Sequence, residues 1–361
     1  MRWIALVESP DHVCCRYRLR AFEPALAANG MSLELASLPR SLLGRHRLFA
    51  SLKGANVILQ RRLLDAWSWR VLRRSAAHVA FDFDDAVWLR DSYSERGLIS
   101  WQRARCFQRT IRESDLVLAG NRFLADAAAS QSDDSKVHII PTAVEASHYP
   151  VAEHTGGLLA RRASKGVPAP AAPPIDTDGQ FVRLVWIGSS STLQGLEKIA
   201  GMLDLLSSRL PNVCLRVVSD RTLQLQQMPV EFWPWSAATE AEALATADIG
   251  IAWLPDDDWS RGKCGLKILQ YMAAGLPVVC NPVGVQRELI QPRWNGFLAA
   301  SASEWFEAIA QLAADAAMRR RFGSFGRNLV ERSFCVRVVA PQLMQALQSV
   351  SRPARTMAAS A

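Results

Sequence analysis

Short β-rich runs alternate with helical stretches from the first residue of the chain, and this alternation constrains the fold more than any other feature. The pattern is typical of βαβ units, in which a helix connects two parallel strands. The alternation forms two series, separated by a stretch that contains PAPAAPP and shows no apolar periodicity. The sequence therefore predicts an α/β protein with two Rossmann-like domains.

The expected strands follow from the β-rich runs. In the first series they are Arg2 to Glu8, Met31 to Ser37, Asn56 to Gln60, His78 to Phe83, Asp115 to Ala119 and Val137 to Ile140. In the second series they are Arg183 to Ile187, Val213 to Ser219, Glu231 to Trp235, Asp248 to Leu254, Leu276 to Cys280 and Gly296 to Leu298. The expected helices include Val13 to Ala28, Leu63 to Ala77, Trp101 to Glu113, Ser303 to Ala313 and Ala316 to Arg332.

These patterns predict the domain boundaries. We expect an N-terminal Rossmann-like domain at 1–150, a Pro/Ala-rich linker or loop at 151–180 and a C-terminal Rossmann-like domain at 181–335. A helix is expected at 336–350. The low-complexity tail SRPARTMAASA, at 351–361, is expected to be disordered.

Composition narrows the class of protein. Of 361 residues, 49% are hydrophobic and 21% are charged, which excludes a disordered chain, collagen and a coiled coil. No apolar run approaches the roughly 18 residues that span a bilayer. The apolar stretch near the N-terminus is short and interrupted by Glu8, Pro10 and Asp11, so a secretory signal is not expected. We therefore expect a cytoplasmic protein.

Charge and cysteine usage restrict the partners. Lys and Arg number 42 against 34 Asp and Glu, a net charge of +8, which favours polyanions such as phosphorylated small molecules, anionic lipid or nucleic acid. The seven cysteines include no CxxC pair, and the histidines show no metal-ligand spacing. Neither a disulfide framework nor a structural zinc site is expected.

The most informative segment is Arg261 to Val285, which reads RGKCGLKILQYMAAGLPVVCNPVGV. A glycine-containing loop enters a helix with apolar residues at helical spacing, Gly275 ends that helix, and a buried strand follows. Backbone N–H groups at a helix N-terminus, with Lys263 and Lys267 nearby, suit a diphosphate. Taken alone, the segment also fits an ordinary α/β connection with incidental lysines.

This segment resembles the donor-binding signature of retaining GT-B glycosyltransferases of family 4, whose core reads like EGFGLVLLEAMAxGxPVV. Gly265 and Leu266 match the Gly-hydrophobic pair, MAAG at 272–275 matches MAxG, and LPVV at 276–279 matches xPVV. Glu288 stands where a glutamate commonly follows. The resemblance implies two Rossmann-like domains that face each other across a cleft, with the last helix crossing back to the first domain. It also implies transfer of a sugar from a nucleotide-diphosphate sugar.

The chain departs from the family at several donor-binding positions. The paired glutamates, which in the family contact the donor sugar and ribose, fall on Gly262 and Gln270. Gln270 can still hydrogen-bond to ribose hydroxyls, whereas Gly262 has no side chain. The family's Arg and Lys that neutralise the leaving diphosphate fall on Ser189 and Gln194, so both cations are missing. We interpret Lys263 and Lys267 as their catalytic replacements.

The first domain supplies candidates for acceptor or phosphate binding. Arg16 and Arg18 begin the helix after the first strand, where an arginine can bind phosphate bidentately or simply be solvated. Asp82, Asp84 and Asp85 end the fourth strand, at the sheet edge that faces ligands in open α/β folds. These acids fit an acceptor site, a base with a raised pKa, a divalent-cation site or a helix cap. We favour an acceptor site without metal, in which Asp84 and Asp85 serve catalysis and Asp82 binds acceptor or phosphate.

Two stretches, Arg61 to Arg74 and Trp101 to Arg112, combine arginines with tryptophans. That composition is typical of helices on an anionic membrane surface, and it also fits solvated helices whose tryptophans lie in the core. A lipid-linked acceptor at the inner membrane face, with the protein peripheral there, is consistent with the first interpretation.

The sequence thus predicts a hexosyltransferase-type glycosyltransferase, retaining by resemblance, that moves a sugar from a nucleotide sugar to a lipid-linked or polysaccharide-precursor acceptor. No cofactor, metal or nucleic-acid partner is expected. The alternative is a non-catalytic protein of the same fold that binds sugar nucleotides or glycans. A dehydrogenase is disfavoured because Gly-x-Gly-x-x-Gly is absent after either first strand.

Overall fold

The computed structural model describes residues 1–152 and 181–350. These residues form two compact units. Unit 1 contains Met1–Ala143, Asp257–Cys264 and the chain from Phe334 onward. Unit 2 contains Val144–Asp256 and Gly265–Ser333. Most of the predicted linker, at 153–180, and the predicted tail, at 351–361, lie outside the described residues.

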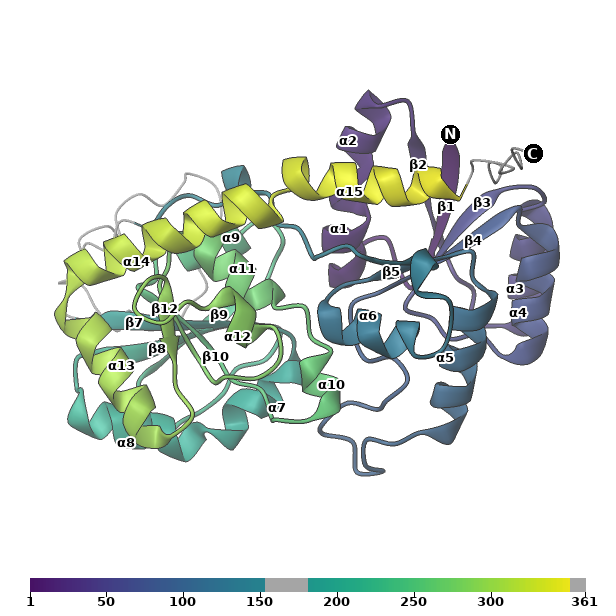
Figure 1. Ribbon diagram of the computed structural model, residues 1–361. Coiled ribbons are helices and arrows are strands. Elements are labelled where there is room, and N and C mark those ends of the chain that lie inside the picture. The colour runs from purple at the N-terminus through teal and green to yellow at the C-terminus, as the bar shows by residue number, and fades with distance from the viewer. Residues whose placement is uncertain (153–180, 351–361) are drawn as a thin grey trace, which may run out of the picture. The chain divides into compact units, whose positions relative to one another are not determined.

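Unit 1 is built on a six-stranded parallel sheet with the order β2-β1-β3-β4-β5-β6 (Figure 1). The strands are β1 (Arg2–Val7), β2 (Ser32–Ser37), β3 (Asn56–Gln60), β4 (His78–Phe83), β5 (Leu116–Ala119) and β6 (Val137–Ile139). Its helices and helical turns are α1 (Val13–Arg18), η1 (Arg20–Phe22), α2 (Glu23–Ala28), α3 (Leu42–Ser51), α4 (Ala66–Ser75), α5 (Trp101–Glu113), α6 (Arg122–Ala129), η2 (Asp134–Lys136), α10 (Asp258–Arg261) and α15 (Val336–Ser349).

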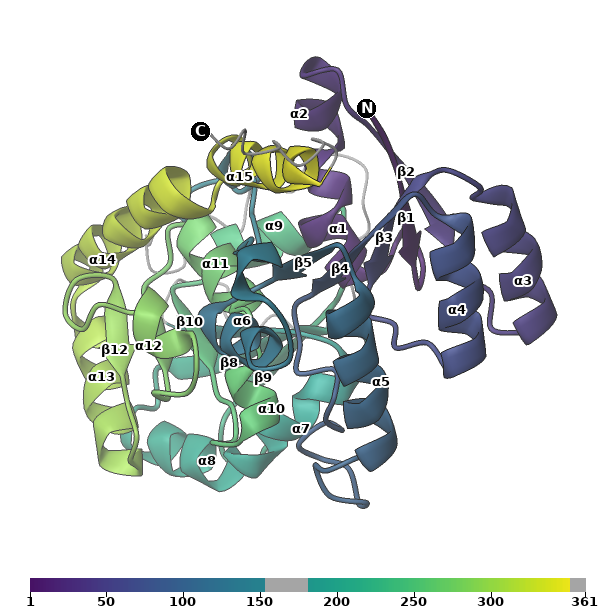
Figure 2. The same cartoon turned by 45° about the vertical axis from the view of Figure 1, so that its right-hand side comes forward.

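Alternation along the strands of unit 1 sends side chains to two hydrophobic clusters. Val57 and Leu59 of β3 pack with residues of α3 to α6, whereas Ile58 packs with residues of α1, η1, α2 and α15. The sheet is therefore covered on both faces, as parallel sheets require. In both views α15 lies beside α1 and α2, although more than 300 residues separate them in the chain (Figures 1 and 2).

Unit 2 repeats this plan with the strand order β12-β11-β10-β7-β8-β9, again parallel. The strands are β7 (Val182–Ile187), β8 (Val213–Ser219), β9 (Val230–Pro234), β10 (Ile249–Ala252), β11 (Val278–Cys280) and β12 (Gly296–Leu298). Its helices and turns are η3 (Ala146–His148), α7 (Ser190–Lys198), α8 (Ala200–Arg209), α9 (Glu240–Ala245), α11 (Leu266–Ala273), α12 (Gln286–Leu289), α13 (Ala302–Ala314) and α14 (Ala316–Leu329).

Helix α11 lies close to the sheet of unit 2 because β10 carries a glycine. Ile249 and Ile251 of β10 enter the core cluster that contains residues of α7, α8 and α13. Gly250 points to the opposite face, where a Cβ would lie 2.4 Å from the Tyr271 ring. Any larger residue at this position would push α11 away from the strand ends.

The α/β prediction with two Rossmann-like sheets is confirmed, and the predicted strands are found with ends shifted by two residues at most. The single helix predicted at Val13 to Ala28 is wrong, because α1 ends at Arg18 and α2 begins at Glu23. Leu19 leaves the helical conformation (φ −130°), and Pro24 in the first turn of α2 cannot donate the backbone N–H that a continuous helix needs. The helix predicted to reach Arg332 ends at Leu329 and continues as a π-helical turn, η4 (Val330–Phe334).

Among the helices of the described residues, none combines the length and the apolar character needed to cross a membrane.

Candidate functional site

Lys267, in the first turn of α11, lies against the loop that follows β7. Its Nζ donates to the hydroxyl of Thr192 at 3.1 Å and lies 4.5 Å from the centre of the Trp186 ring. A Cβ at Gly188 would lie 2.6 Å from this Nζ, so the ammonium group occupies the space that a side chain would fill. The structure thus brings together Lys267 and the predicted donor residues Gly188 and Ser189, at the carboxyl end of β7.

The N-terminus of α11 adds positive electrostatic potential beside Lys267. Gly265 precedes the helix in the left-handed conformation (φ 71°), and a Cβ there would lie 2.6 Å from Leu289, so glycine is required on both counts. The N-cap residue of α11 is a glycine and so has no side chain that could cap the helix. At α7, Asp220 accepts from the backbone N–H of Ser190, in the first turn, at 2.6 Å. The start of α11, rather than that of α7, is therefore the helix end suited to an anion.

Gln270 lies one helical turn further along α11 and is buried. Its amide nitrogen donates to the Tyr149 hydroxyl at 3.2 Å, and that hydroxyl donates to Glu240 at 3.5 Å. Glu240 also accepts from the indole N–H of Trp235 at 2.9 Å. These bonds fix Gln270 within unit 2, and its contact with a donor ribose stays a prediction. Of the other predicted donor residues, Leu266 is half-buried and Glu288 is exposed on α12.

In unit 1, Asp84 and Asp85 follow β4 and share one arginine. Arg61, directly after β3, holds Asp84 through Nη1 at 2.8 Å and Asp85 through Nη2 at 2.5 Å. Its backbone lies in the left-handed region (φ 57°), which is uncommon for a residue with a side chain. Lys263 completes the group, with Nζ 2.8 Å from Asp85 Oδ1 and 3.5 Å from the centre of the Trp259 ring. We call Arg61, Asp84, Asp85 and Lys263 the charged cluster.

A second ion pair lies deeper, between Asp82 of β4 and Arg18 of α1. The Arg18 Nε donates to Asp82 at 3.2 Å, and one of its terminal nitrogens donates to the carbonyl of Ile140. Arg18 is only 1% exposed, so the structure gives it a buried positioning role in place of the predicted contact with phosphate. Arg16 is half-buried, with its guanidinium 5.4 Å from the centre of the Tyr17 ring, and its phosphate contact stays a prediction.

The protein itself compensates the charge of the three acids. Burial by itself would raise the pKa of Asp84, but the positive charges of Arg61 and Arg18 more than offset it, so this pKa lies below its ordinary value. Asp84 is therefore ionised at neutral pH, which suits it to accept a hydrogen bond from a hydroxyl and not to act as a base with a raised pKa. Burial raises the pKa of Asp82, an effect that Arg18 opposes. Within residues 1–152 and 181–350, no group of three or more Asp, Glu, His or Cys side chains is arranged to hold a metal ion.

Segment 257–264 belongs to unit 1 by its contacts. The Asn121 amide donates to the carbonyls of Gly262, at 3.2 Å, and Lys263, at 3.0 Å. A Cβ at Gly262 would lie 2.7 Å from the backbone nitrogen of Ala86, so this position is closed to any side chain. Lys263 is paired with Asp85 in unit 1, whereas Lys267 lies beside Gly188 in unit 2. Their joint action at a diphosphate stays a prediction.

Gly262→Ala should therefore destabilise unit 1 by about 1–3 kcal/mol, since the new methyl group meets backbone atoms that cannot move aside. Gly201→Ala, inside α8, is the matched control: nothing lies within 4 Å of its Cβ position, and alanine favours a helix by roughly 0.5–1 kcal/mol. Chemical unfolding of both variants tests the contrast. Equal stability of the two would contradict the packing of Gly262 on Ala86.

Sequence reasoning missed three residues of these sites. Arg61 was assigned to a surface stretch, although its position directly after β3, at the carboxyl end of the sheet, was a usable signal. No sequence motif marks Asn121 or Thr192. The contacts of these two residues are with residues 142 and 75 positions away, which no local pattern reveals.

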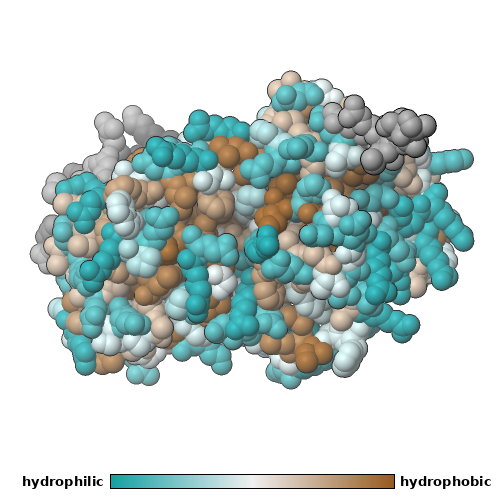
Figure 3. All heavy atoms as spheres, viewed as in Figure 1, coloured by the Kyte–Doolittle hydropathy of each residue, from teal (hydrophilic) through white to brown (hydrophobic). Residues whose placement is uncertain are grey.

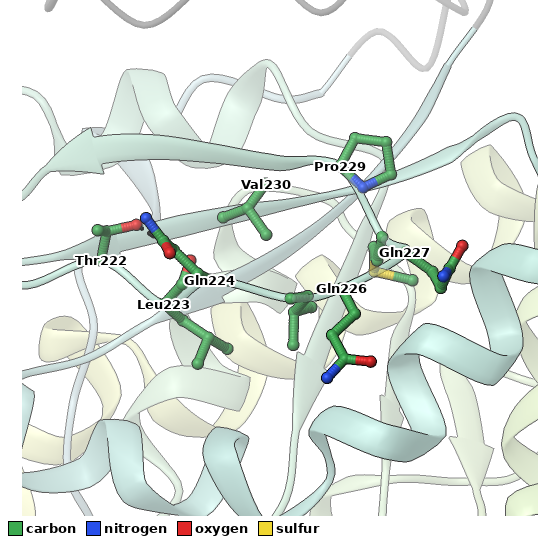
Figure 4. A pocket seen from close by; sticks show the side chains of 9 residues that line it. Thr222, Leu223, Gln224, Gln226, Gln227, Pro229 and Val230 are labelled. Atoms are coloured by element: carbon green, nitrogen blue, oxygen red, sulfur yellow. Dashed lines mark hydrogen bonds between the residues drawn. The ribbon is translucent and has the colours of Figure 1, made fainter.

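A hollow of about 460 Å³ lies along the crossover from β8 to β9 (Figure 4). Its lining is the loop Thr222–Val230, which Asp204 holds by accepting the backbone N–H groups of Gln226, Gln227 and Met228. None of the predicted donor residues lines this hollow.

Comparison with known proteins shows which family the second half of the chain resembles. Residues 181–315, which contain β7, α11 and Lys267, match the sequence profile of glycosyl transferases group 1. No curated protein matches the chain in sequence.

Solved structures confirm the GT-B fold of this glycosyltransferase. Sucrose-phosphate synthase from Thermosynechococcus elongatus is 17% identical, with a TM-score of 0.69 over 97% of this chain and 98% of that one. Anabaena HepE, solved with UDP-glucose, is 16% identical, with a TM-score of 0.66 over 97% and 100% of the two chains. WaaB, a lipopolysaccharide outer core galactosyltransferase, is 12% identical, with a TM-score of 0.60 over 96% and 99%. The profile match at 181–315 and the shared fold together indicate a glycosyltransferase that uses a nucleotide sugar.

Proposed function

We propose that this glycosyltransferase moves a hexose from a nucleotide-diphosphate sugar to a lipid-linked or polysaccharide-precursor acceptor, with retention of configuration. The proposed binding of the donor rests on Lys267, whose side chain lies against Thr192, Trp186 and Gly188 at the N-terminus of α11. Because HepE was solved with UDP-glucose, UDP-sugars are the first donors to test. Retention rests on the resemblance to family 4.

Stabilisation of the departing diphosphate is the main catalytic effect of this arrangement. Negative charge grows on the leaving group toward the transition state, and the Lys267 ammonium group and the N–H groups of α11 are already in place to meet it. Because Trp186 and Thr192 hold the Lys267 side chain, little reorganisation is needed. In unit 1, Asp84 and Asp85 accept a hydrogen bond from the acceptor hydroxyl and orient it.

The test is direct. The purified enzyme is incubated with UDP-, GDP- and ADP-sugars, and slow release of the nucleoside diphosphate is measured without acceptor. Release from one of these donors, and its acceleration by a lipid-linked acceptor, is expected. Tight binding of a nucleotide sugar without release would instead support the non-catalytic alternative, which the glycine at position 262 favours.

The charged cluster should work without a metal ion, because Arg61 and Lys263 already neutralise its carboxylates. EDTA is expected to leave sugar transfer unchanged. Asp84→Asn should lower transfer about tenfold, which is the loss of one charge-assisted hydrogen bond, and nucleotide binding should be kept. Since the pKa of Asp84 is lowered, this loss should be the same from pH 6 to pH 8. Inactivation by EDTA that Mg²⁺ or Mn²⁺ reverses would indicate a cation site instead.

A further inference from the structure

The loop between β4 and α5 ends in two exposed apolar side chains. Ile99 is 68% exposed and Trp101 is 85% exposed, and Trp101 is the most exposed large apolar side chain among the described residues. Burying them in a hydrophobic environment would be favourable, and an exposed apolar group of this kind marks an interaction surface. The loop projects from the foot of unit 1 in both ribbon views, and hydrophobic atoms gather there on the molecular surface (Figures 1, 2 and 3).

The loop is held in a defined shape. Leu89 and Ile99 form an antiparallel bridge, and the backbone N–H of Arg90 donates to Leu98 at 2.8 Å. The Arg90 guanidinium closes the turn by donating to the carbonyls of Arg96, at 3.2 Å, and Ile99, and Gly97 supplies a left-handed residue (φ 68°). We call residues 89–101 the hairpin. Ile99 and Trp101, at the base of the hairpin beside α5, are presented by a fixed scaffold, so little conformational entropy is lost when they bind.

Arginines extend from the hairpin along the outer face of α5. Arg105 and Arg112 are exposed and follow Trp101 at helical spacing, Arg109 between them is half-buried, and Phe107 and Ile111 form the buried face. Arg96 and Arg103 are also exposed, and exposed Asp91 and Glu95 are the acids of the hairpin. The surface therefore combines an exposed apolar pair, Ile99 and Trp101, with exposed arginines.

The other arginine-rich stretch of unit 1, on α4, is arranged differently. Trp69 is fully buried and its indole N–H donates to Glu113 at 2.5 Å. Trp67 stacks on His46, with ring centres 5.7 Å apart. The tryptophans of α4 thus serve the fold and contacts between helices. Trp67 is still 50% exposed, but Trp101 of α5 is 85% exposed.

We propose that the hairpin is a membrane-docking element that inserts Ile99 and Trp101 into the interface of an anionic bilayer, while the exposed Arg105 and Arg112 contact lipid headgroups. Tryptophan favours the membrane interface, and arginines near anionic lipid strengthen the attraction. The proposal deepens the proposed function, on which it rests for the lipid-linked acceptor. The hairpin begins only four residues after Asp85, so docking would bring lipid to the charged cluster.

The test is co-sedimentation of the full chain with vesicles of phosphatidylglycerol and phosphatidylcholine, with pure phosphatidylcholine as the neutral control. The double variant Ile99→Ser, Trp101→Ser should bind the anionic vesicles at least about tenfold more weakly. Leu42→Ser, Leu43→Ser is the matched control, because these side chains of α3 are 55% and 63% exposed elsewhere on unit 1. Wild-type binding should fall steeply above about 0.15 M salt.

Unchanged binding by the hairpin variant, or loss of binding by the α3 variant alone, would overturn the proposal. If the hairpin variant binds vesicles as the wild type does but changes from dimer to monomer, Ile99 and Trp101 form a contact between copies of the chain instead. Release of nucleoside diphosphate serves as the folding control, since the hairpin lies outside the donor site. Vesicle binding does not depend on turnover. Transfer to a soluble acceptor would therefore refute the lipid-linked acceptor of the proposed function, whereas the vesicle-binding result would still stand.

Discussion

Lys267→Ala is expected to lower the turnover number about 100-fold, with a much smaller effect on the binding of the nucleotide sugar. The lost ammonium group faces charge that develops on the diphosphate only as the sugar leaves, and removal of one such preorganised donor typically costs 10²–10³ in rate. Lys267→Arg should recover part of the rate, because the charge is kept while the fit beside Gly188 is lost. Steady-state kinetics with the donor that supports turnover provides the measurement.

Lys198→Ala is the matched control for this experiment. Lys198 is an exposed lysine at the end of α7, in the same unit, and its removal changes the net charge by the same amount. Full activity of Lys267→Ala would refute the assignment of the leaving-group site to α11. Equal losses in both variants would instead point to a general electrostatic effect of unit 2.

Asp82→Asn is expected to destabilise unit 1 by about 3–5 kcal/mol, because it leaves the buried Arg18 charge without its partner. Both side chains are almost completely buried, so solvent cannot compensate the lost attraction. Urea unfolding, followed by a signal from unit 1, measures the change. The double variant Arg18→Met, Asp82→Leu should be closer to the wild type than Asp82→Asn is, since no charge is then stranded. A destabilisation below about 1 kcal/mol would show that the pair is solvated.

The fold was predictable because its signals are local. Strands such as β3 and β8 are β-rich runs whose predicted and observed bounds are the same, and the α11 segment combines helical spacing with Gly275 and Pro277 at its end. The break between α1 and α2 was missed because Pro24 is tolerated in the first turn of a helix and its effect depends on Leu19 upstream.

The candidate sites were predictable only in part, since ion pairs join residues that are distant in the chain. The carboxyl-end rule located Asp82, Asp84 and Asp85 correctly at the end of β4. It does not tell which cation each acid meets, and Lys263 stands 178 positions from Asp85 in the numbering. Lys263 and Lys267 are four positions apart, so their spacing suggests one shared role. In the structure Lys263 contacts Asp85 of unit 1 and Lys267 contacts Thr192 of unit 2.

The most direct test of the account is a crystal structure of the enzyme with the nucleoside diphosphate of its donor. The account predicts that the β-phosphate lies within hydrogen-bond distance of Lys267 Nζ, at the N-terminus of α11, with Gly188 and Ser189 beside it. The account would be contradicted by a diphosphate bound away from α11, with Lys267 still in contact with Thr192 and Trp186.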